Sequence, residues 1–289
     1  MTETRSFAGL SPETVLEVVR RTAWDASDRL RDYYRGEIPL NPEEEAEGPV
    51  TAADRAVNRL LLDRFQEAFG DAPFGYLSEE SFKEQGRQEP FPQEYLWIID
   101  PLDGTRDFID HTGEYALHIA LVKAQRPVFT CVVLPEAERL YWAMLDEGCW
   151  REDRTGDRQR VTVTPRAAGD SLTLVASRSH RDERFRQLLE RLSLQNQIYV
   201  GSVGFKIATI LEGQADVYLS LSGKSAPKDW DMAAPELLLT EAGGRFTHAD
   251  GSPLRYNTGD VSQWGCLIAS NGSGHDALCQ ETSRILTEI

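Results

Sequence analysis

Residues 97–105 have the sequence W-I-I-D-P-L-D-G-T, and they bring together the clearest structural and chemical signals in the chain. The apolar run Tyr95–Asp100 predicts a buried strand that ends in a carboxylate. Pro101 then turns the chain, so that Asp103 returns toward the same point. The turn also exposes the Leu102 carbonyl, which is a hard oxygen ligand. We therefore expect a strand that delivers several oxygen donors to one place.

The chemistry of these donors predicts a metal site. Two carboxylates a few ångströms apart repel each other unless one is protonated or a cation lies between them. Asp100, Asp103 and the Leu102 carbonyl offer oxygen only, which favours Mg²⁺ over zinc or copper. The N–H groups of Gly104 and Thr105, where a helix could start, would add a phosphate-binding position. Taken alone, D-P-L-D-G also fits an ordinary turn, since these are turn-forming residues.

Three other acidic segments are candidates to complete this site, and each also has a purely structural interpretation. Glu79 and Glu80 follow a predicted strand but fit a solvated loop, since glutamates are mostly exposed. Asp231 lies at the start of a predicted helix and fits a helix N-cap. Asp54 has the capping-box spacing from Thr51. For each segment by itself, both interpretations stay open.

The two halves of the chain show different patterns. Residues 1–160 suggest helices packed on an antiparallel sheet, whereas residues 161–289 alternate strand and helix. We predict an α/β protein with an α+β N-terminal half, a division near residue 160, and an exposed, mobile acidic loop at residues 37–48. The expected helices are 11–36, 51–69, 182–192, 205–212, 232–242 and a last one from His275; the expected strands are 95–100, 116–122, 128–134, 139–144, 171–177, a short run at Tyr199, 215–221 and 267–270.

The bulk composition excludes several classes of protein. The 289 residues are 40% hydrophobic and 27% charged, as in ordinary soluble proteins. No apolar run approaches the roughly 20 residues that cross a bilayer, and residues 1–9 show no secretory signal. The four cysteines are widely spaced, which argues against a disulfide framework or a zinc site and favours a cytoplasmic location. Two of them lie in strand-like apolar runs, where we expect buried reduced thiols. The formal charge of −16 argues against nucleic-acid polymers, but not against a small phosphate, because metal ions reverse the local field.

The acidic segments occur together in an order that is known from one family. An acidic pair at 79–80, D-P-L-D-G-T at 100–105 and W-D at 230–231 follow V-T-A-A-D at 50–54. This combination resembles the inositol monophosphatase superfamily over about residues 15–255. The resemblance implies a layered αβαβα sandwich and a Mg²⁺-dependent phosphomonoesterase that is inhibited by lithium and forms no covalent phosphoenzyme.

The resemblance also implies a role for each matching residue. One Mg²⁺ would be held by Glu79, Asp100 and the Leu102 carbonyl, and a third, weaker ion would also use Glu79. The ligands of the second Mg²⁺ would be Asp100, Asp103 and Asp231, and the catalytic residues would be Asp54, Thr105 and Glu79.

Within the superfamily, the chain most resembles the CysQ-type 3'(2'),5'-bisphosphate nucleotidases of sulfur metabolism. The segments G-E-Y at 113–115 and S-R-S-H at 177–180 carry this likeness, and K-D-W-D at 228–231 resembles the animal bisphosphate nucleotidases. It implies that 3'-phosphoadenosine 5'-phosphate is converted to AMP and phosphate. Two features depart from the pattern: the loop 42–48 is acidic where some relatives are rich in lysine, and Val203 replaces a serine of some relatives. The implied substrate-binding residues are Asp103, Gly104, Thr105, Ser177, His180, Gly201, Ser202, Lys206, Lys228 and Asp231.

Other interpretations stay open at this point. Lys206 also fits an exposed helix lysine, and His180 a loop histidine without a role. The chain could instead be an inositol mono- or 1,4-bisphosphate phosphatase with the same metal site, or a non-catalytic binding protein that keeps the fold. Because every expected ligand is present, we favour an enzyme, a monomer or homodimer whose partner is a small phosphorylated nucleotide and not a nucleic-acid polymer or a membrane. No stretch has the ligand spacing of an EF-hand.

Overall fold

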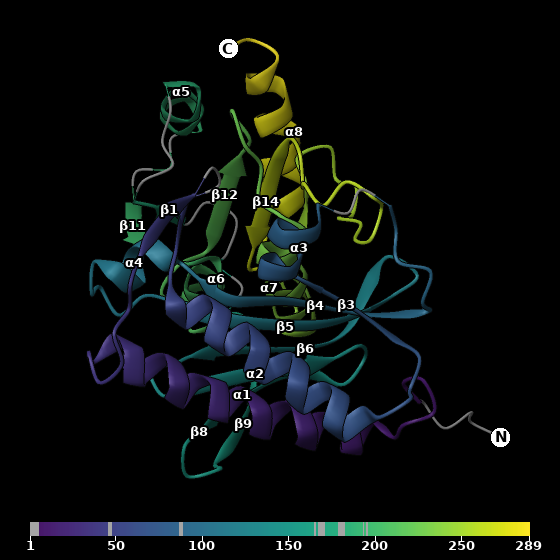
Figure 1. The fold of residues 1–289 in the computed structure, drawn as a ribbon. Coiled ribbons are helices and arrows are strands. Elements are labelled where there is room, and N and C mark those ends of the chain that lie inside the picture. Colours follow the sequence, from purple (N-terminus) through teal and green to yellow (C-terminus); the bar gives the residue numbers. More distant parts are fainter. Residues whose placement is uncertain are drawn as a thin grey trace, which may run out of the picture.

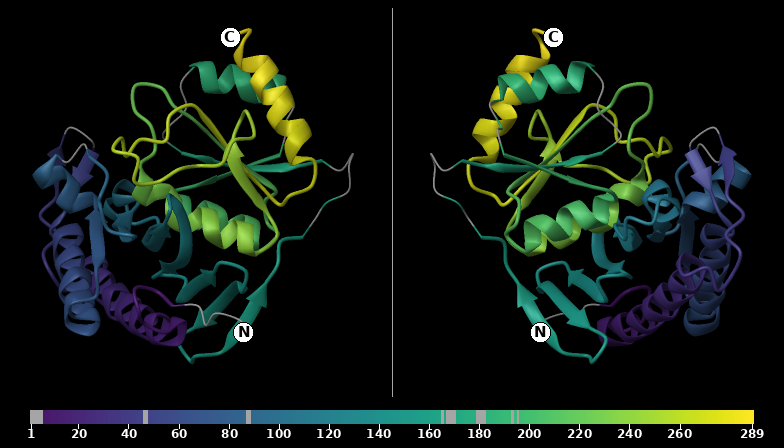
Figure 2. Two further views of the ribbon diagram at one scale, coloured as in Figure 1. Left: turned by 90° about the vertical axis from the view of Figure 1, so that its right-hand side faces the viewer. Right: turned by 90° about the vertical axis from the view of Figure 1, so that its left-hand side faces the viewer.

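The computed structural model describes residues 6–45, 48–86, 89–164, 166, 171–178, 183–192, 194 and 196–289. The described chain forms five layers, in the order helices, sheet, helices, sheet, helices (Figures 1 and 2). The predicted αβαβα sandwich is therefore confirmed. No helix among the described residues is long and apolar enough to cross a membrane.

The first sheet has seven strands in the sequential order β3 to β9. Only β3 and β4 run parallel, and the other neighbours are antiparallel. The sequence did not predict β8 or β9, because their charged residues hide the alternation that marks a strand. The strands are β3 Phe74–Ser78, β4 Tyr95–Asp103, β5 Ala116–Lys123, β6 Arg126–Leu134, β7 Arg139–Met144, β8 Gly148–Asp153 and β9 Arg158–Val161.

Helices α1 (Pro12–Tyr34) and α2 (Ala52–Phe69) cover the outer face of this sheet. Ser11 caps α1, with its hydroxyl accepting the N–H of Thr14 at 3.2 Å. The apolar stripes of both helices pack on alternate residues of β4, such as Trp97. The remaining β4 residues, such as Ile98, face the middle of the molecule. This burial on both faces explains the continuous apolar run of the strand.

Helices α6 (Val203–Leu211) and α7 (Asp229–Glu241) form the middle layer between the two sheets (Figure 2). They are buried almost all round because a sheet lies on each side of them. One core cluster joins residues of the first sheet, the two helices and the second sheet. The division into two domains near residue 160 stays a prediction.

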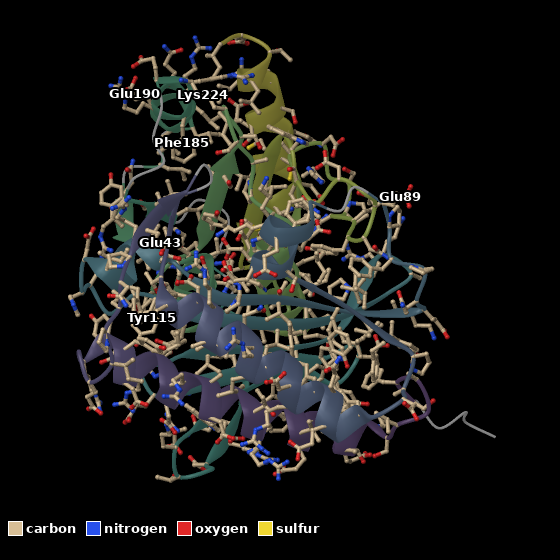
Figure 3. All side chains as sticks on the ribbon, viewed as in Figure 1. Glu43, Glu89, Tyr115, Phe185, Glu190 and Lys224 are labelled. Atoms are coloured by element: carbon tan, nitrogen blue, oxygen red, sulfur yellow. The ribbon has the colours of Figure 1, made fainter. Side chains whose placement is uncertain are left out.

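The second sheet has the strand order β11-β10-β12-β14-β13, and its strands β10, β11 and β12 are parallel. Helices α5 (Glu183–Arg191) and α8 (His275–Leu286) cover its outer face at the top of Figure 1. Charged side chains such as Glu190 project outward there (Figure 3). The strands are β10 Thr173–Ser177, β11 Asn196–Val200, β12 Val217–Leu221, β13 Arg245–His248 and β14 Cys266–Ser270.

Several local predictions were wrong or incomplete. The expected mobile loop contains a short antiparallel pair, β1 (Glu43–Glu45) and β2 (Gly48–Val50). Helix α7 begins three residues earlier than the predicted start at residue 232. Helix α3 (Glu79–Gln85) follows directly after β3 and was not predicted, whereas α4 (Thr105–Ile109) begins where a helix start was expected. Short helices of this kind carry too few turns to show a period in the sequence. All four cysteines are buried and free, whereas burial was predicted for two of them.

Candidate active site

The parallel pairing of β3 and β4 places the first two candidate acids side by side. Ser78 lies opposite Ile99 in the register, so Glu79 and Asp100 leave neighbouring strands at the same edge of the sheet. Parallel strands deliver their carboxyl ends to one edge. The sequence could not show this, because the pairing joins segments that are separate along the chain.

A bulge in β4 returns Asp103 to the same place. Asp100 pairs with His118 and Asp103 with Ala116, so three residue steps on β4 face two on β5. Pro101 lies in the bulge, where its missing N–H disrupts no ladder. The Leu102 N–H donates to Asp100 Oδ1 at 3.0 Å. The predicted turn is therefore an irregular strand, and it keeps both carboxylates on one side.

Asp54 and Asp231 come from helix starts on opposite sides of the sheet. Both are the third residue of a helix and accept the N–H of the N-cap residue; at Asp54 the Thr51 side chain completes a capping box. Asp54 Oδ2 accepts the N–H of Thr51 at 2.8 Å, and Asp231 Oδ2 accepts that of Lys228 at 2.7 Å. The structural interpretation of Asp54 is thus correct, and that of Asp231 as an N-cap is wrong, because Lys228 holds the N-cap position.

Asp54 also contacts the residue predicted to act with it. The Thr105 hydroxyl lies 3.3 Å from Asp54 Oδ1 and 3.2 Å from the Leu102 carbonyl oxygen. Asp54 therefore uses one oxygen in the capping box and turns the other toward Thr105. The structure brings together this predicted catalytic pair and a predicted metal-binding carbonyl.

Burial and mutual repulsion raise the pKa of three carboxyl groups. Burial raises the pKa of Asp54 to about 7, and the nearby Glu79 carboxylate adds to this effect. Burial raises the pKa of Asp231 to about 7, with Asp103 and Glu79 adding to it. Burial, Glu79 and Asp103 raise the pKa of Asp100 well above its ordinary value. Such repulsion requires that these carboxylates, which come from four different segments, lie close together.

Asp103 behaves in the opposite way. Burial acts to raise its pKa, but His118, Lys206 and the Gly204 N–H outweigh burial and hold the pKa below its ordinary value. His118 Nε2 lies 3.1 Å from Asp103 Oδ2, and the Gly204 N–H donates to the same oxygen at 2.9 Å. A Cβ on Gly204 would lie 2.4 Å from His118 Nε2, so only glycine allows α6 to start so close.

Lys206 is buried, so its interpretation as an exposed helix lysine was wrong. Its side chain donates to the Gly201 carbonyl, and burial lowers its pKa to about 8. The N–H of Gly201 donates to Glu114 Oε2 at 2.8 Å, and the N–H of Ser202 donates to the Glu114 carbonyl at 3.1 Å. A Cβ on Gly104 would lie 3.0 Å from the Ser202 Cβ. The predicted substrate residues of the two halves are thus adjacent, although several of their donors have partners within the chain.

The remaining predicted substrate residues are placed in part. Ser177 ends β10 opposite Val200, so it lies at the same edge of the second sheet as Gly201. Its neighbour Arg178 contacts the carboxylates of Asp107 at 2.7 Å and Glu114 at 2.6 Å. His180 lies outside the described residues. Lys228 Nζ lies 3.3 Å from the Ser262 hydroxyl.

The donor set fits Mg²⁺ in its chemistry. Its members are oxygens, they are buried or half-buried, and their mutual repulsion is the kind that a divalent cation relieves. Among the described residues, no three His, Cys, Asp or Glu side chains already converge as a finished metal shell. Instead, the acids contact partners of the protein, as Asp103 contacts His118 and Glu79 contacts Lys83 at 2.9 Å.

Sequence reasoning missed two residues of this site, His118 and Lys83. His118 is a lone histidine in an apolar strand, and only the register with β4 shows that it faces the acids. Lys83 lies four residues after Glu79, a spacing that matters only on a helix, and α3 was not predicted. Lys224, which precedes the Asp231 segment, is exposed, and Figure 3 shows it at the level of α5.

Comparison with known proteins agrees with this geometry. The family model of the inositol monophosphatases matches residues 11–287. The chain belongs to the inositol monophosphatase family. The protein is therefore a metal-dependent phosphomonoesterase that acts on a small phosphorylated molecule.

Individual relatives of this phosphatase are similar in sequence or in fold. The 3'(2'),5'-bisphosphate nucleotidase CysQ of Salmonella typhimurium is 33% identical over 244 residues, which cover 84% of this chain and 94% of that protein. The extragenic suppressor protein SuhB of Bartonella henselae has the same fold, with a TM-score of 0.75, 23% identity and coverage of 93% and 98%. CysQ of Bacteroides thetaiotaomicron gives a TM-score of 0.70 at 27% identity, with coverage of 88% and 96%. The fold is thus common to relatives with different names.

Proposed function

We propose that this phosphatase is a 3'(2'),5'-bisphosphate nucleotidase that removes the 3'-phosphate of 3'-phosphoadenosine 5'-phosphate. The observation that carries the proposal is the likeness to CysQ nucleotidases along 84% of the chain. The S-R-S-H segment and the buried cation Lys206 beside the carboxylates support it. A second phosphate group needs positive charge beyond the metal ions, and these residues provide it.

We propose that Glu79, Asp100 and the Leu102 carbonyl hold one Mg²⁺, and that Asp100, Asp103 and Asp231 hold a second. A third, weaker ion would use Glu79. When bound, Mg²⁺ supplies positive charge that makes water more acidic and stabilises the phosphoryl group and the leaving oxygen. The raised pKa values of Asp100 and Asp231 support this assignment, because these groups lack enough positive charge of their own.

Asp54 and Thr105 would direct the water. The Thr105 hydroxyl has one proton and lies between two acceptors, Asp54 Oδ1 and the Leu102 carbonyl. Once that proton is donated, the oxygen of Thr105 can accept a hydrogen bond only from a further donor, such as water. With a pKa of about 7, Asp54 is suited to take up a proton near neutral pH.

We propose that Gly104 and Thr105 contact the 3'-phosphate together with Asp103 and Asp231. Ser177, His180, Gly201, Ser202, Lys206 and Lys228 would surround the nucleoside and its 5'-phosphate. Because Lys206 is only 3% exposed, we expect it to act on the substrate through its positive charge and not through a direct surface contact. Such a charge attracts a buried phosphate more strongly than a surface lysine would.

Phosphate release from a panel of substrates tests this proposal. The panel holds 3'-phosphoadenosine 5'-phosphate, its sulfated form, inositol 1-phosphate, inositol 1,4-bisphosphate and fructose 1,6-bisphosphate. We expect the highest kcat/KM for the first two. A preference for an inositol phosphate would overturn the nucleotide assignment and leave the metal site in place. No Mg²⁺-dependent release from any of them would indicate a non-catalytic protein.

Two variants test the substrate contacts. His180→Ala and Lys206→Met each remove one charge-assisted interaction, worth roughly 1.5–3 kcal/mol, or about ten- to a hundredfold in kcat/KM. The loss from His180→Ala should fall on the bisphosphate nucleotide and spare a small monophosphate that does not reach this residue. Lys206→Met should lower both activities in part, because Lys206 also lowers the pKa of Asp103, but the loss should be larger on the nucleotide. Equal losses on both substrates would assign the two residues to the fold or the metal site.

A further inference from the structure

Lys83 is a cation that contacts Glu79, one of the clustered acids of the candidate site, and the proposed reaction gives it no role. It lies on α3, one helical turn after Glu79, so the two side chains share a face of the helix. Its Nζ lies 2.9 Å from Glu79 Oε1 and 3.3 Å from Glu80 Oε1. The Lys83 side chain is 16% exposed, so water screens these contacts only in part.

Glu79 is the carboxylate through which Lys83 reaches the rest of the group. Among the acids described, Glu79 repels Asp54, Asp100 and Asp231. Its charge therefore raises the pKa of all three. A cation fixed on Glu79 relieves part of this repulsion, and it does so from within the same short helix.

We propose that Lys83 is a built-in counter-cation that neutralises Glu79 in the metal-free enzyme and competes with Mg²⁺ for that carboxylate. The inference rests on the proposed metal assignment of Glu79. To bind Mg²⁺, Glu79 must give up its contact with Lys83, and the ammonium group then lies beside a divalent ion. Both effects weaken Mg²⁺ binding, whereas the contact stabilises the protein before the metal arrives.

The α6 side of the site offers a contrast that supports this role. Asp103 has donors that approach it from other segments, the Gly204 N–H and His118. Lys83 instead lies on the same short helix as Glu79 and has an adjacent alternative partner in Glu80. It can therefore release Glu79 and keep an ion pair, which suits an exchange of one cation for another.

Titration calorimetry with Mg²⁺ and melting of the metal-free protein test the proposal together. Lys83→Met keeps the length of the side chain and removes its charge. We expect it to bind Mg²⁺ about three- to tenfold more tightly, since one positive charge near the ion is lost. The same variant should melt at a lower temperature without metal, because the repulsion around Glu79 is no longer balanced. Mg²⁺ affinity that is unchanged or weaker in Lys83→Met overturns the proposal.

Two further variants serve as controls. Lys83→Arg keeps the charge and should stay within about twofold of the wild type in Mg²⁺ affinity. Lys123→Met removes a lysine from a comparable pair with Glu94, 2.8 Å apart at the far end of β4, and should not change Mg²⁺ affinity. If the wild type binds no Mg²⁺, the metal assignment fails and this inference with it. If the wild type binds Mg²⁺ and Lys83→Met binds it with the same affinity, the inference alone fails.

Discussion

Asp100, on the side of the site next to α3, and Asp103, on the side next to α6, are both buried carboxyl groups, but their surroundings shift their pKa values in opposite directions. On the α3 side, Asp100 accepts the Leu102 N–H and faces other carboxylates, and its pKa is raised. On the α6 side, Asp103 lies three residues later and is also buried, but its pKa is lowered. Since burial acts on both in the same direction, the difference comes from the donors and cations that surround Asp103.

This contrast shows that the site is electrostatically incomplete on one side only. His118, Lys206 and the start of α6 balance the charge of Asp103 within the protein. On the other side, Lys83 pairs with Glu79, yet the pKa of Asp100 stays raised, so Asp100 gains most from an external cation. The following predictions test this contrast, in decreasing order of expected effect.

The largest effect is expected at the two aspartates themselves. Asp100→Asn should lower kcat by roughly a thousandfold or more, because it removes a ligand shared by two ions. The same change should leave the metal-free melting temperature equal or higher, since a repelling charge is gone. Asp103→Asn should also lose activity but melt at a lower temperature, because His118 and Lys206 lose their partner.

Activity assays in saturating Mg²⁺ and melting curves in chelator would check both variants. Near-normal activity of Asp100→Asn would contradict the metal assignment. Stability changes of the same sign in Asp100→Asn and Asp103→Asn would contradict the contrast between the two sides.

A smaller effect is expected at His118, which contacts the proposed metal ligand Asp103 and is not itself a proposed ligand. His118 Nε2 faces Asp103, and its Nδ1 lies 3.2 Å from the Trp230 carbonyl, next to Asp231. His118→Ala should reduce activity by about ten- to a hundredfold, as is usual when the support of a metal ligand is removed. His118→Asn, which keeps one N–H donor, should lose less. Equal losses in the two variants would show that the histidine fills space and does not orient Asp103.

The increase in Tm that Mg²⁺ causes should itself change with pH, by a few degrees. Asp54 and Asp231 have a pKa of about 7 in the folded protein, above the ordinary value of about 3.9 in an unfolded chain. Between about pH 4 and pH 7, the folded metal-free protein therefore holds more protons than the unfolded chain, and this contribution to stability declines as pH rises. Mg²⁺ competes with these protons, so its stabilising effect should grow over the same window.

Melting curves with Mg²⁺ and with chelator at pH 5, 6, 7 and 8 measure this effect. The difference in Tm should increase with pH, at about 2–4 °C for each kcal/mol gained. His275, whose pKa burial lowers to about 4, titrates in both series and cancels in the difference. A difference in Tm that is constant from pH 5 to pH 8 would mean that Asp54 and Asp231 do not exchange protons for metal.

Inhibition by lithium is the mildest of these expected effects. The family resemblance predicts inhibition at sub-millimolar to millimolar concentration, since lithium takes one magnesium position. Lys206 already balances part of the charge of Asp103, so a monovalent ion suits that side better than the α3 side. Steady-state rates at several Mg²⁺ and Li⁺ concentrations would check it. An enzyme that saturates with Mg²⁺ and is indifferent to lithium would have a different second site.

The sequence alone indicated the buried strand and the acids of the proposed site, and the family resemblance implied the layered fold. The apolar run 95–100 is long and continuous because β4 is buried on both faces, and such a pattern is visible without a structure. The capping box at Thr51 and Asp54 was predictable for the same reason, since its hydrogen bonds join residues three apart. Features that depend on residues close together in the sequence could therefore be predicted from the sequence.

Only the tertiary structure decided how those acids are balanced. The register of β3, β4 and β5 sets Glu79 beside Asp100 and turns His118 toward Asp103. The approach of α6 brings the Gly204 N–H to Asp103 and buries Lys206, a residue whose type alone predicts exposure. These effects depend on distances between segments far apart in sequence, and a Coulomb interaction is set by distance and burial, not by order along the chain.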